Sequence, residues 1–336
     1  MQSQTKRLLT AEQLDAMLRA SADTGCRVEA ELTDGWFNSA YRVRLDDGRP
    51  AIVKVAPHAD VPVLRYERGI MRTEATVYRQ LAAVGGIPLP ELIHQGPDFL
   101  VISVLDGIPW DKAGDQVPTG RQDALRRELG RITARLHTVR SPDGRFGYPA
   151  PEAGLTGADW PTAFSAMVEA ILEDAGRWDS PLGIAPDEVR SLVAAGADAL
   201  GEVTDAALVH FDLWPGNIFI SAGVTADVTS DGRPPGVTGL IDHERAFYGD
   251  PAAELVSLDF GGGIGPDGPL VAGYLEAGGR LPFGPSLRRR LALYRLYLGL
   301  LLVVECGPRG YGADHIAYCR RTLDSWAAAL RDLTNS

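Results

Sequence analysis

The spacing of apolar residues changes near residue 105, and this change constrains the fold more than any other feature of the sequence. Before this point, short runs of strand character, YRVRL, PAIVKVA and FLVISVL, are separated by turn sequences such as DDG and GPD. One helical stretch, at about residues 72–83, lies between the second and the third run. After this point, apolar residues recur at helical spacing, as at Leu125, Leu129, Ile132 and Leu136. The sequence therefore predicts a small sheet that carries one helix, followed by a larger and mostly helical part.

The length of the chain favours two lobes. At 336 residues, of which 45% are hydrophobic, the chain is longer than one compact core usually holds. The longest uncharged apolar run, Leu296–Val304, is well short of a membrane span, and the N-terminal sequence MQSQTKRLLT has no apolar run behind its basic residues. We therefore expect no membrane partner and no targeting segment.

Charge and cysteine content bear on partners and on the cellular compartment. Lys and Arg total 33 against 44 Asp and Glu, and a net charge of −11 argues against a nucleic-acid partner. Cys26, Cys306 and Cys319 are odd in number, far apart in the sequence and without C-x-x-C spacing. They predict neither a disulfide framework nor a zinc site, and they fit a reducing cytoplasm.

Polar residues gather in an otherwise apolar segment, LVHFDLWPGNIFI at Leu208–Ile220. Its proline and glycine exclude a helix, so we expect a loop that leads into a short strand, NIFI. A second short apolar run downstream ends at Asp242, and a hairpin of the two strands would bring Asn217 close to Asp242, with Asp212 nearby. Carboxylate and amide oxygens form a ligand set suited to Mg²⁺, and this cation in turn suggests a phosphate substrate.

The order of these motifs carries a family resemblance. The pattern H-x-D-x-x-x-x-N at His210, Asp212 and Asn217 is followed by I-D at residues 241–242 and by G-D-P-x-x-E at residues 249–254. This resembles the aminoglycoside phosphotransferase family, which includes fructosamine and choline kinase relatives and shares the catalytic core of protein kinases. The resemblance covers roughly residues 30–330. It implies an α+β, protein-kinase-like fold: a small antiparallel sheet lobe with one helix at residues 1–102, a hinge at 103–107 and a larger helical lobe at 108–336.

The resemblance also requires a strand lysine for the nucleotide phosphates and a helical glutamate that holds the lysine. Lys54 in AIVKV and Glu74 in RTEATVYRQL meet this requirement, and Glu67 is a competing partner for the lysine. At the end of FLVISVL, where the hinge begins, the Ser103 carbonyl and the Leu105 amide are implied to bind adenine.

The sequence departs from the protein-kinase pattern in several places. The turn TDGWFNSAYRV has one glycine where protein kinases carry G-x-G-x-x-G, so phosphate contacts are expected from Asn38 and Ser39. DHE replaces D-F-G, and no A-P-E segment follows, which disfavours protein kinase activity. Phe211 stands where many relatives have glycine, and we expect it to add bulk beside Asp212 at the acceptor entrance.

The implied reaction is transfer of the γ-phosphoryl group of ATP to a hydroxyl of a small molecule. Asp212 would accept the hydroxyl proton, Asn217 and Asp242 would hold Mg²⁺, and Lys54, held by Glu74, would bind the α- and β-phosphates. The carboxylates and the amide could instead be turn formers or caps. His210 is interpreted as a structural residue of the loop, and Asp250 as an acceptor of backbone hydrogen bonds from the loop.

The acceptor is predicted from charge. Residues 152–205 carry eleven acidic residues against two basic ones, and such a field would attract a cationic acceptor such as an amino sugar or a basic antibiotic. The alternative is that these residues are solvated helix faces. A fructosamine, sugar or other metabolite kinase and a nucleotide-binding pseudokinase that acts through partners are the alternative functions.

Overall fold

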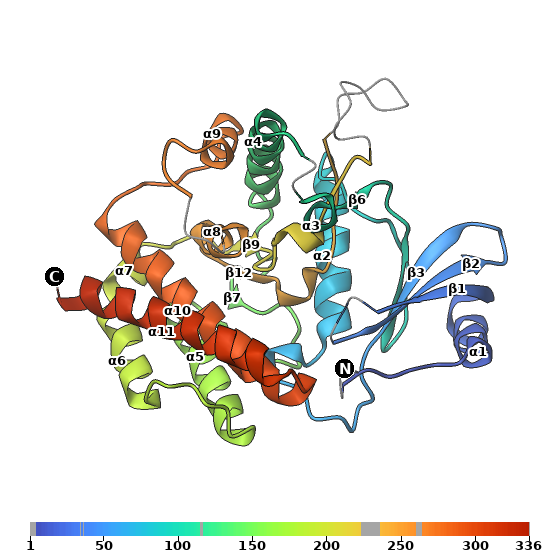
Figure 1. Ribbon diagram of the computed structural model, residues 1–336, viewed down its shortest axis with the longest axis horizontal. Helices are drawn as coiled ribbons and strands as arrows, with labels where there is room; N and C mark the ends of the chain where they lie inside the picture. Colours follow the sequence, from blue (N-terminus) through green and yellow to red (C-terminus); the bar gives the residue numbers. More distant parts are fainter. Residues whose placement is uncertain are drawn as a thin grey trace.

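The computed structural model describes residues 5–33, 35, 37–114, 117–222, 236–259 and 264–335 (Figure 1). The chain is α+β, with a sheet at the N-terminal side and a larger helical part that follows it, as the sequence predicts. A five-stranded antiparallel sheet has the order β1-β2-β3-β5-β4. Its strands are β1 (Cys26–Leu32), β2 (Ser39–Leu45), β3 (Pro50–Val55), β4 (Leu92–Gln95) and β5 (Phe99–Ser103).

The sheet carries two helices rather than the single helix expected. These helices are α1 (Ala11–Ala22) and α2 (Ile70–Val84). The second is the predicted one. The first begins with a capping box, in which the Thr10 hydroxyl accepts from the Gln13 amide and the Gln13 side chain accepts from the Thr10 amide. Leu14 and Leu18, one turn apart, are fully buried against the sheet. Both signals are present in the sequence, so α1 was predictable and was missed.

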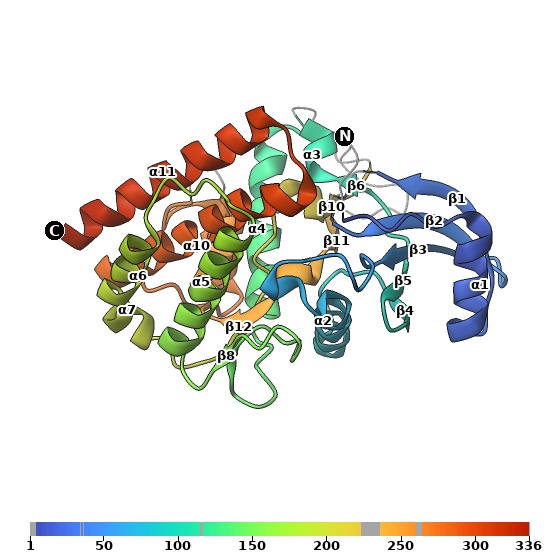
Figure 2. The same cartoon turned by 90° about the horizontal axis from the view of Figure 1, so that it is seen from below.

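Side-chain alternation along β3 decides where Lys54 points. Val53 and Val55 belong to the apolar cluster that α1 covers. Successive residues of a strand point to opposite faces, so Lys54 faces the other side. There its neighbour in β5, Leu100, is buried in a cluster with Ile70 of α2. Figures 1 and 2 show α2 between the sheet and the helical part, which is where a side chain on this face arrives.

The C-terminal part is built around α5 and α10. Its helices are α3 (Trp110–Ala113), α4 (Thr119–Leu136), α5 (Trp160–Arg177), α6 (Pro186–Ala195), α7 (Ala197–Gly201), α8 (Glu254–Leu258), α9 (Pro269–Glu276), α10 (Pro285–Arg309) and α11 (Ala313–Asn335). Trp160 and Phe164 of α5 pack against Tyr294 and Tyr297 of α10. The indole of Trp160 donates to the Tyr294 hydroxyl over 2.8 Å, so its polar atom is satisfied inside the core.

Helix α10 is long and apolar enough to cross a membrane by length and composition. However, 78% of its most apolar window is buried inside the protein. It is therefore the core helix of the C-terminal part, and Figure 2 shows it between α5 and α11.

Short strands and 3-10 turns complete the C-terminal part. The strands are β6 (Ile108–Pro109), β7 (Phe146–Gly147), β8 (Thr156–Gly157), β9 (Ala207–Val209), β10 (Ile218–Ile220), β11 (Val237–Leu240) and β12 (Phe247–Gly249). The 3-10 turns are η1 (Arg65–Glu67), which precedes α2, and η3 (Pro215–Asn217), η4 (His243–Arg245) and η5 (Pro251–Ala253). The short strands form two small sheets, with the orders β11-β10-β6 and β8-β7-β12-β9.

The predicted hairpin is present. Strands β10 and β11 pair antiparallel, with Ile218 opposite Leu240. The Ile241 amide donates to the Asn217 carbonyl over 3.1 Å, so Asn217 and the residue after Ile241, Asp242, leave the hairpin at the same end. Most of the expected proline- and glycine-rich turn between the strands lies outside the described residues.

Residues 103–107 run from the sheet to this hairpin. The Asp106 carbonyl accepts from the Thr238 hydroxyl over 2.7 Å. Gly107 has φ +105°, and a Cβ atom on it would lie 2.3 Å from the Ile220 carbonyl oxygen. Glycine is therefore required where the crossing segment meets β10.

Candidate active site

Lys54 lies between two carboxylates. Its Nζ atom is 2.7 Å and 2.8 Å from the two carboxylate oxygens of Glu74 on α2, and 2.7 Å from Oδ1 of Asp242. Burial opposes the charge on Lys54, but Asp242 and Glu74 outweigh it and hold the pKa of Lys54 well above its usual range. Burial raises the pKa of Glu74. The structure therefore brings Lys54 and Glu74 together as predicted, and it adds Asp242 to the pair.

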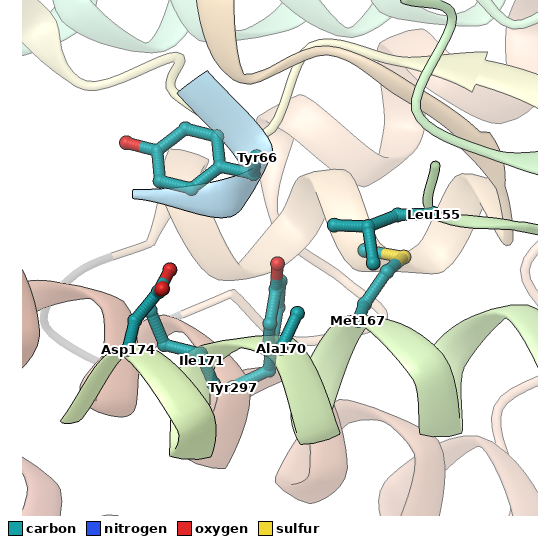
Figure 3. Close-up of a pocket in the computed structure, with 7 residues that line it drawn as sticks. All are labelled: Tyr66, Leu155, Met167, Ala170, Ile171, Asp174 and Tyr297. Atoms are coloured by element: carbon teal, nitrogen blue, oxygen red, sulfur yellow. The ribbon is translucent and has the colours of Figure 1, made fainter. Parts of the chain in front are cut away.

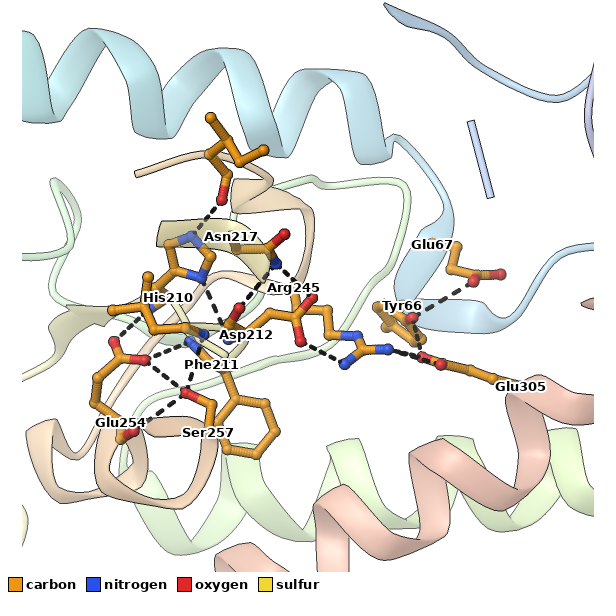
Figure 4. Close-up of polar contacts among 12 residues, drawn as sticks. Tyr66, Glu67, His210, Phe211, Asp212, Asn217, Arg245, Glu254, Ser257 and Glu305 are labelled. Atoms are coloured by element: carbon orange, nitrogen blue, oxygen red, sulfur yellow. Dashed lines mark hydrogen bonds and ion pairs between the residues drawn. The ribbon is translucent and has the colours of Figure 1, made fainter. Parts of the chain in front are cut away.

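Asp212 and Asn217 lie at the start of the same hairpin (Figure 4). The Asn217 amide nitrogen donates to the Asp212 carbonyl over 2.9 Å and to Oδ2 of Asp212 over 3.2 Å. Burial raises the pKa of Asp212 to about 7, although the adjacent Arg245 opposes this shift. A carboxyl with a pKa near neutrality can accept a proton from a hydroxyl and release it again to solvent.

The oxygen atoms of Asn217 and Asp242 suit a hard cation. Asn217 uses its nitrogen on Asp212, and its Oδ1 makes no hydrogen bond to another described residue. Asp242 uses Oδ1 on Lys54, and the described residues contribute no hydrogen bond to its Oδ2. Two unengaged oxygen atoms at one end of a hairpin are the donor type that Mg²⁺ prefers, so these residues fit the predicted metal.

The loop before Asp212 is held by Glu254 rather than by Asp250. Glu254 is fully buried at the start of α8, and its carboxylate accepts from the amides of His210 over 2.7 Å and Phe211 over 3.0 Å. Asp250 instead accepts from the Ala252 amide and from side chains of α10. The expected role of Asp250 is therefore wrong, because η5 directs its side chain toward α10. The acidic residue of G-D-P-x-x-E that reaches the loop is the last one.

His210 ties the loop to the end of β11. It is fully buried, and its Nδ1 accepts from the Asp212 amide over 3.2 Å. Since Nδ1 accepts, Nε2 carries the proton and donates to the Ile241 carbonyl over 2.9 Å. Burial lowers the pKa of His210, which keeps the ring neutral. These contacts agree with the structural role expected for this residue.

Phe211 points away from the acceptor entrance. Its backbone has φ +61°, a left-handed conformation that costs a non-glycine residue strain. Its side chain is fully buried, with ring centroids 5.1 Å from Phe247 and 5.8 Å from Tyr297. The expectation that Phe211 adds bulk beside Asp212 is therefore wrong. The ring instead anchors the loop in the helical core and offsets the strained backbone.

Arg245 was not predicted, and it contacts Asp212 directly. Its Nη1 donates to Oδ1 of Asp212 over 2.8 Å, and its Nη2 is 2.7 Å from Oε2 of Glu305 on α10 (Figure 4). Glu305 also pairs with Arg309 over 2.6 Å, and Arg309 reaches Glu67 over 3.0 Å. Glu67, the competing partner for Lys54, therefore belongs to a separate buried chain of charges. For Glu305 and Arg309 a sequence signal was available, because charged residues within an apolar helical run must find partners if the helix is buried.

Asn38 and Ser39 lie at the start of β2, the strand that pairs with β3 beside Lys54. Ser39 and Ala40 of β2 pair with Val55 and Lys54 of β3. The Asn38 amide donates over 2.8 Å to Glu244, a buried acid in η4 that was not predicted. One oxygen each of Glu74, Asp242 and Glu244 lies within 4.8 Å of the others. The buried Oδ1 of Asn38 and hydroxyl of Ser39 have no hydrogen-bond partner among the described residues. Asn38 and Ser39 are thus beside the site, with polar atoms still to be satisfied.

The crossing segment leaves part of its backbone unengaged. The amide and the hydroxyl of Ser103 are both bonded to Glu91, each over 2.9 Å. The Leu105 amide makes no hydrogen bond to another described residue, while its side chain packs against Gly239 of β11. The adenine contacts implied for Ser103 and Leu105 remain predictions.

A small cavity under η1 is not a substrate site. It lies between Tyr66 and the α5 side chains Met167 and Asp174, with Leu155 and Tyr297 also in its wall (Figure 3). It is too narrow to hold a water molecule. We interpret it as a packing defect of the core.

The acidic segment is partly neutralised by residues from other parts of the chain. Arg65 is 3.2 Å from Glu173, Arg72 is 3.0 Å from Glu152, and Arg290 is 2.8 Å from Glu202. All three arginines lie outside residues 152–205, so the sequence count overstates the local field. The charge argument for a cationic acceptor is weaker than the count implied, and the alternative of solvated helix faces stays open.

Comparison with known proteins identifies the family. Residues 29–294 match the sequence profile of the phosphotransferase enzyme family, and the chain belongs to this family. It is a small-molecule phosphotransferase. A probable ketoamine kinase of Staphylococcus aureus (strain NCTC 8325 / PS 47) is 26% identical over 298 residues, which cover 82% of this chain and 86% of that protein.

Solved structures share the fold. A candidate fructosamine-3-kinase from Thermobifida fusca superposes with a TM-score of 0.65 at 23% identity and covers 95% of this chain and 98% of its own. The aminoglycoside phosphotransferase APH(4)-Ia, crystallised with ADP and hygromycin B, gives a TM-score of 0.57 at 18% identity, with coverage of 94% and 98%. The predicted protein-kinase-like fold is thereby confirmed.

Proposed function

We propose that this protein transfers the γ-phosphoryl group of ATP to a hydroxyl of a small molecule. The observation that carries the proposal is the position of Lys54 between Glu74 and Asp242, at the end of the hairpin that also holds Asn217 and Asp212. Phosphoryl transfer requires a lysine that binds phosphate, a base and oxygen ligands for a metal ion. The site holds a lysine fixed by carboxylates, a candidate base and two unengaged oxygen atoms.

Each residue has one task in this proposal. Lys54, oriented by Glu74, binds the α- and β-phosphates. Asn217 and Asp242 hold Mg²⁺, which neutralises charge on the phosphate oxygens. Asp212 accepts the proton of the substrate hydroxyl while the hydroxyl oxygen bonds to the γ-phosphorus. The bond from the γ-phosphorus to the bridging oxygen of the β-phosphate breaks, and ADP leaves. Catalysis is then mainly positioning and charge stabilisation.

The nucleotide contacts follow the same proposal. Residues 1–102 form the nucleotide lobe, 103–107 the hinge and 108–336 the acceptor lobe. Asn38 and Ser39 contact phosphate, which would satisfy their unpartnered polar atoms. Ser103 and Leu105 contact adenine through backbone atoms. We place the enzyme in the cytoplasm, where ATP is available.

For the acceptor we propose an amine-bearing compound with a sugar hydroxyl, such as an aminoglycoside or another amino sugar. A ketoamine such as a fructosamine is the second candidate, because the Staphylococcus aureus relative is described as a ketoamine kinase and aligns with most of both chains. Both classes combine a cationic nitrogen with sugar hydroxyls.

The test is a substrate panel. Purified protein is incubated with Mg-ATP and, in parallel, Mg-GTP, together with aminoglycosides, macrolides, fructosamines, amino alcohols and neutral sugars. Mass spectrometry detects the gain of one phosphoryl group. We expect a phosphorylated amine-bearing compound with the wild type, and an initial rate lower by roughly 10²-fold or more with Asp212→Asn. If Mg-dependent ATP turnover is absent with every compound, the pseudokinase alternative replaces the proposal. A protein substrate that outperforms every small molecule would overturn the acceptor class.

A further inference from the structure

Two buried thiols and one imidazole meet where α10 turns into α11. Gly310 ends α10 in a left-handed conformation with φ +65°, and its amide donates to the Cys306 carbonyl over 3.1 Å. The chain then reverses into α11 (Figure 1). His315 and Cys319 are four residues apart on α11, and this spacing places them on one face of the helix. A ligand atom of Cys306, His315 and Cys319 each lies within 4.8 Å of the other two. The sequence spacing of the cysteines gave no sign of this, because the elbow brings them together.

We propose that Cys306, His315 and Cys319 form a binding site for a thiophilic cation such as Zn²⁺. Two sulfur atoms and an imidazole nitrogen are the ligands that Zn²⁺ prefers, and they disfavour Mg²⁺, which takes oxygen ligands. On binding, each cysteine exchanges its S–H bond for an S–Zn bond and releases a proton to solvent, and the imidazole contributes a lone pair. The cation keeps its charge state, so no oxidant or reductant is needed.

Two buried thiols and one exposed imidazole would leave one coordination position of a bound ion open to solvent. Cys306 and Cys319 are 4% and 1% exposed, whereas His315 is exposed. The solvent side of the site can therefore supply a water molecule as the fourth ligand, as in zinc sites with three protein ligands. The ring centroids of His315 and Tyr311 are 4.2 Å apart, so the imidazole is packed against the elbow rather than extended into solvent.

The site requires little rearrangement. The Cys306 thiol donates to the Leu302 carbonyl of its own helix over 3.1 Å, a weak bond that deprotonation would release. The Leu302 carbonyl lies in the interior of α10, where helical backbone hydrogen bonding satisfies it without the thiol. A bound ion would link α10 to α11 and stabilise the elbow, because it binds the folded arrangement and not the unfolded chain.

The first test measures binding and spectra. Protein stripped of metal under reducing conditions is titrated with Zn²⁺ against a chromophoric chelator, and with Co²⁺ as a spectroscopic probe. We expect one equivalent to bind, sulfur-to-cobalt charge-transfer absorption, and a rise of the melting temperature with Zn²⁺. Cys306→Ser and Cys319→Ser should each lower the charge-transfer absorption, because one thiolate remains, and should weaken Zn²⁺ binding by about 100-fold or more, since even outer-shell changes cost 10- to 100-fold. The variant that lacks both cysteines should lose the absorption. His315→Ala should keep the absorption and weaken binding.

The matched control is Cys26→Ser, which removes a half-buried thiol of β1 and should leave all readouts unchanged. Cobalt binding without thiolate absorption, or failure of the wild type to take Zn²⁺ from the chelator, would overturn the proposal. A Cys306–Cys319 disulfide that persists in the protein purified under reducing conditions would overturn it as well and would identify the pair as a disulfide instead.

Discussion

At the scale of single residues, Asp212 is the group on which the proposed chemistry depends. Asp212→Asn keeps the size of the side chain and removes the proton acceptor. We expect phosphoryl transfer to fall by roughly 10²-fold or more, the scale of general-base contributions, while nucleotide binding changes little. Steady-state kinetics and calorimetry with Mg-ATP measure the two effects. Near-normal turnover in the variant would show that Asp212 is not the base.

The pKa of Asp212 gives a prediction with a definite sign. Burial raises this pKa to about 7, so kcat/KM at low concentrations of both substrates should increase as the pH rises through about 7 and then level off. Arg245 acts in the opposite direction and lowers the pKa of Asp212. Arg245→Gln should therefore move the rising limb to higher pH. Arg72→Gln, at an exposed ion pair, is the control and should leave the profile in place. An unmoved limb in Arg245→Gln would contradict this electrostatic assignment.

The roles of some of these residues could be predicted from the sequence and those of others could not, for physical reasons. Lys54 and Glu74 were predictable because the family resemblance requires a strand lysine and a helical glutamate that holds it. Arg245 was not, since its contact with Asp212 depends on the 3-10 turn η4, whose preceding residue Asp242 has φ +67°. A turn of this kind reorients side chains over three residues and leaves no periodic pattern to detect.

At the scale of elements, the loop before Asp212 is stabilised by α8 through one carboxylate. In Glu254→Gln the side chain keeps its shape but presents one oxygen and one NH₂ group to two amide donors, those of His210 and Phe211. Loss of one charge-assisted bond and burial of an unmatched donor should lower the free energy of unfolding by about 2–3 kcal/mol. Urea denaturation measures this change. Glu152→Gln, at an exposed ion pair, should cost far less, and equal losses in the two variants would refute the proposed importance of the clamp.

Elements were predicted better than their contacts. The hairpin β10–β11 and the helix α2 followed from apolar periodicity and turn residues, which are local signals. The acidic segment shows the limit of local counting, since Arg65 and Arg290 neutralise Glu173 and Glu202 from distant parts of the chain. Charge density read along a sequence does not include such partners, whereas the folded surface does.

At the scale of the whole molecule, a buried chain of charges joins the segment before α2 to α10 and to Asp212. Glu67 of η1 pairs with Arg309, Arg309 with Glu305, and Glu305 with Arg245, with each side chain at most 9% exposed. The buried chain of charges from Glu67 to Arg245 contains two acids and two arginines, so removal of one of them leaves an uncompensated buried charge. Asp212, the proposed base, is thereby linked to the position of η1 relative to the helical core.

A double-mutant cycle tests this link. Arg309→Met should lower the free energy of unfolding by about 3–5 kcal/mol, because the carboxylates of Glu67 and Glu305 lose a shared partner in a buried environment. Burial raises the pKa of Glu67 even with Arg309 present, so its neutral form is easily reached. Glu67→Gln in the Arg309→Met background should therefore cost little or restore part of the stability, whereas Glu67→Gln alone should destabilise. Urea denaturation of the four proteins gives the coupling energy. Strictly additive losses would show that Glu67 and Arg309 do not act as a pair, and η1 would then be joined to Glu305 through the Tyr66 hydroxyl, which donates to the Glu305 carboxylate over 2.6 Å.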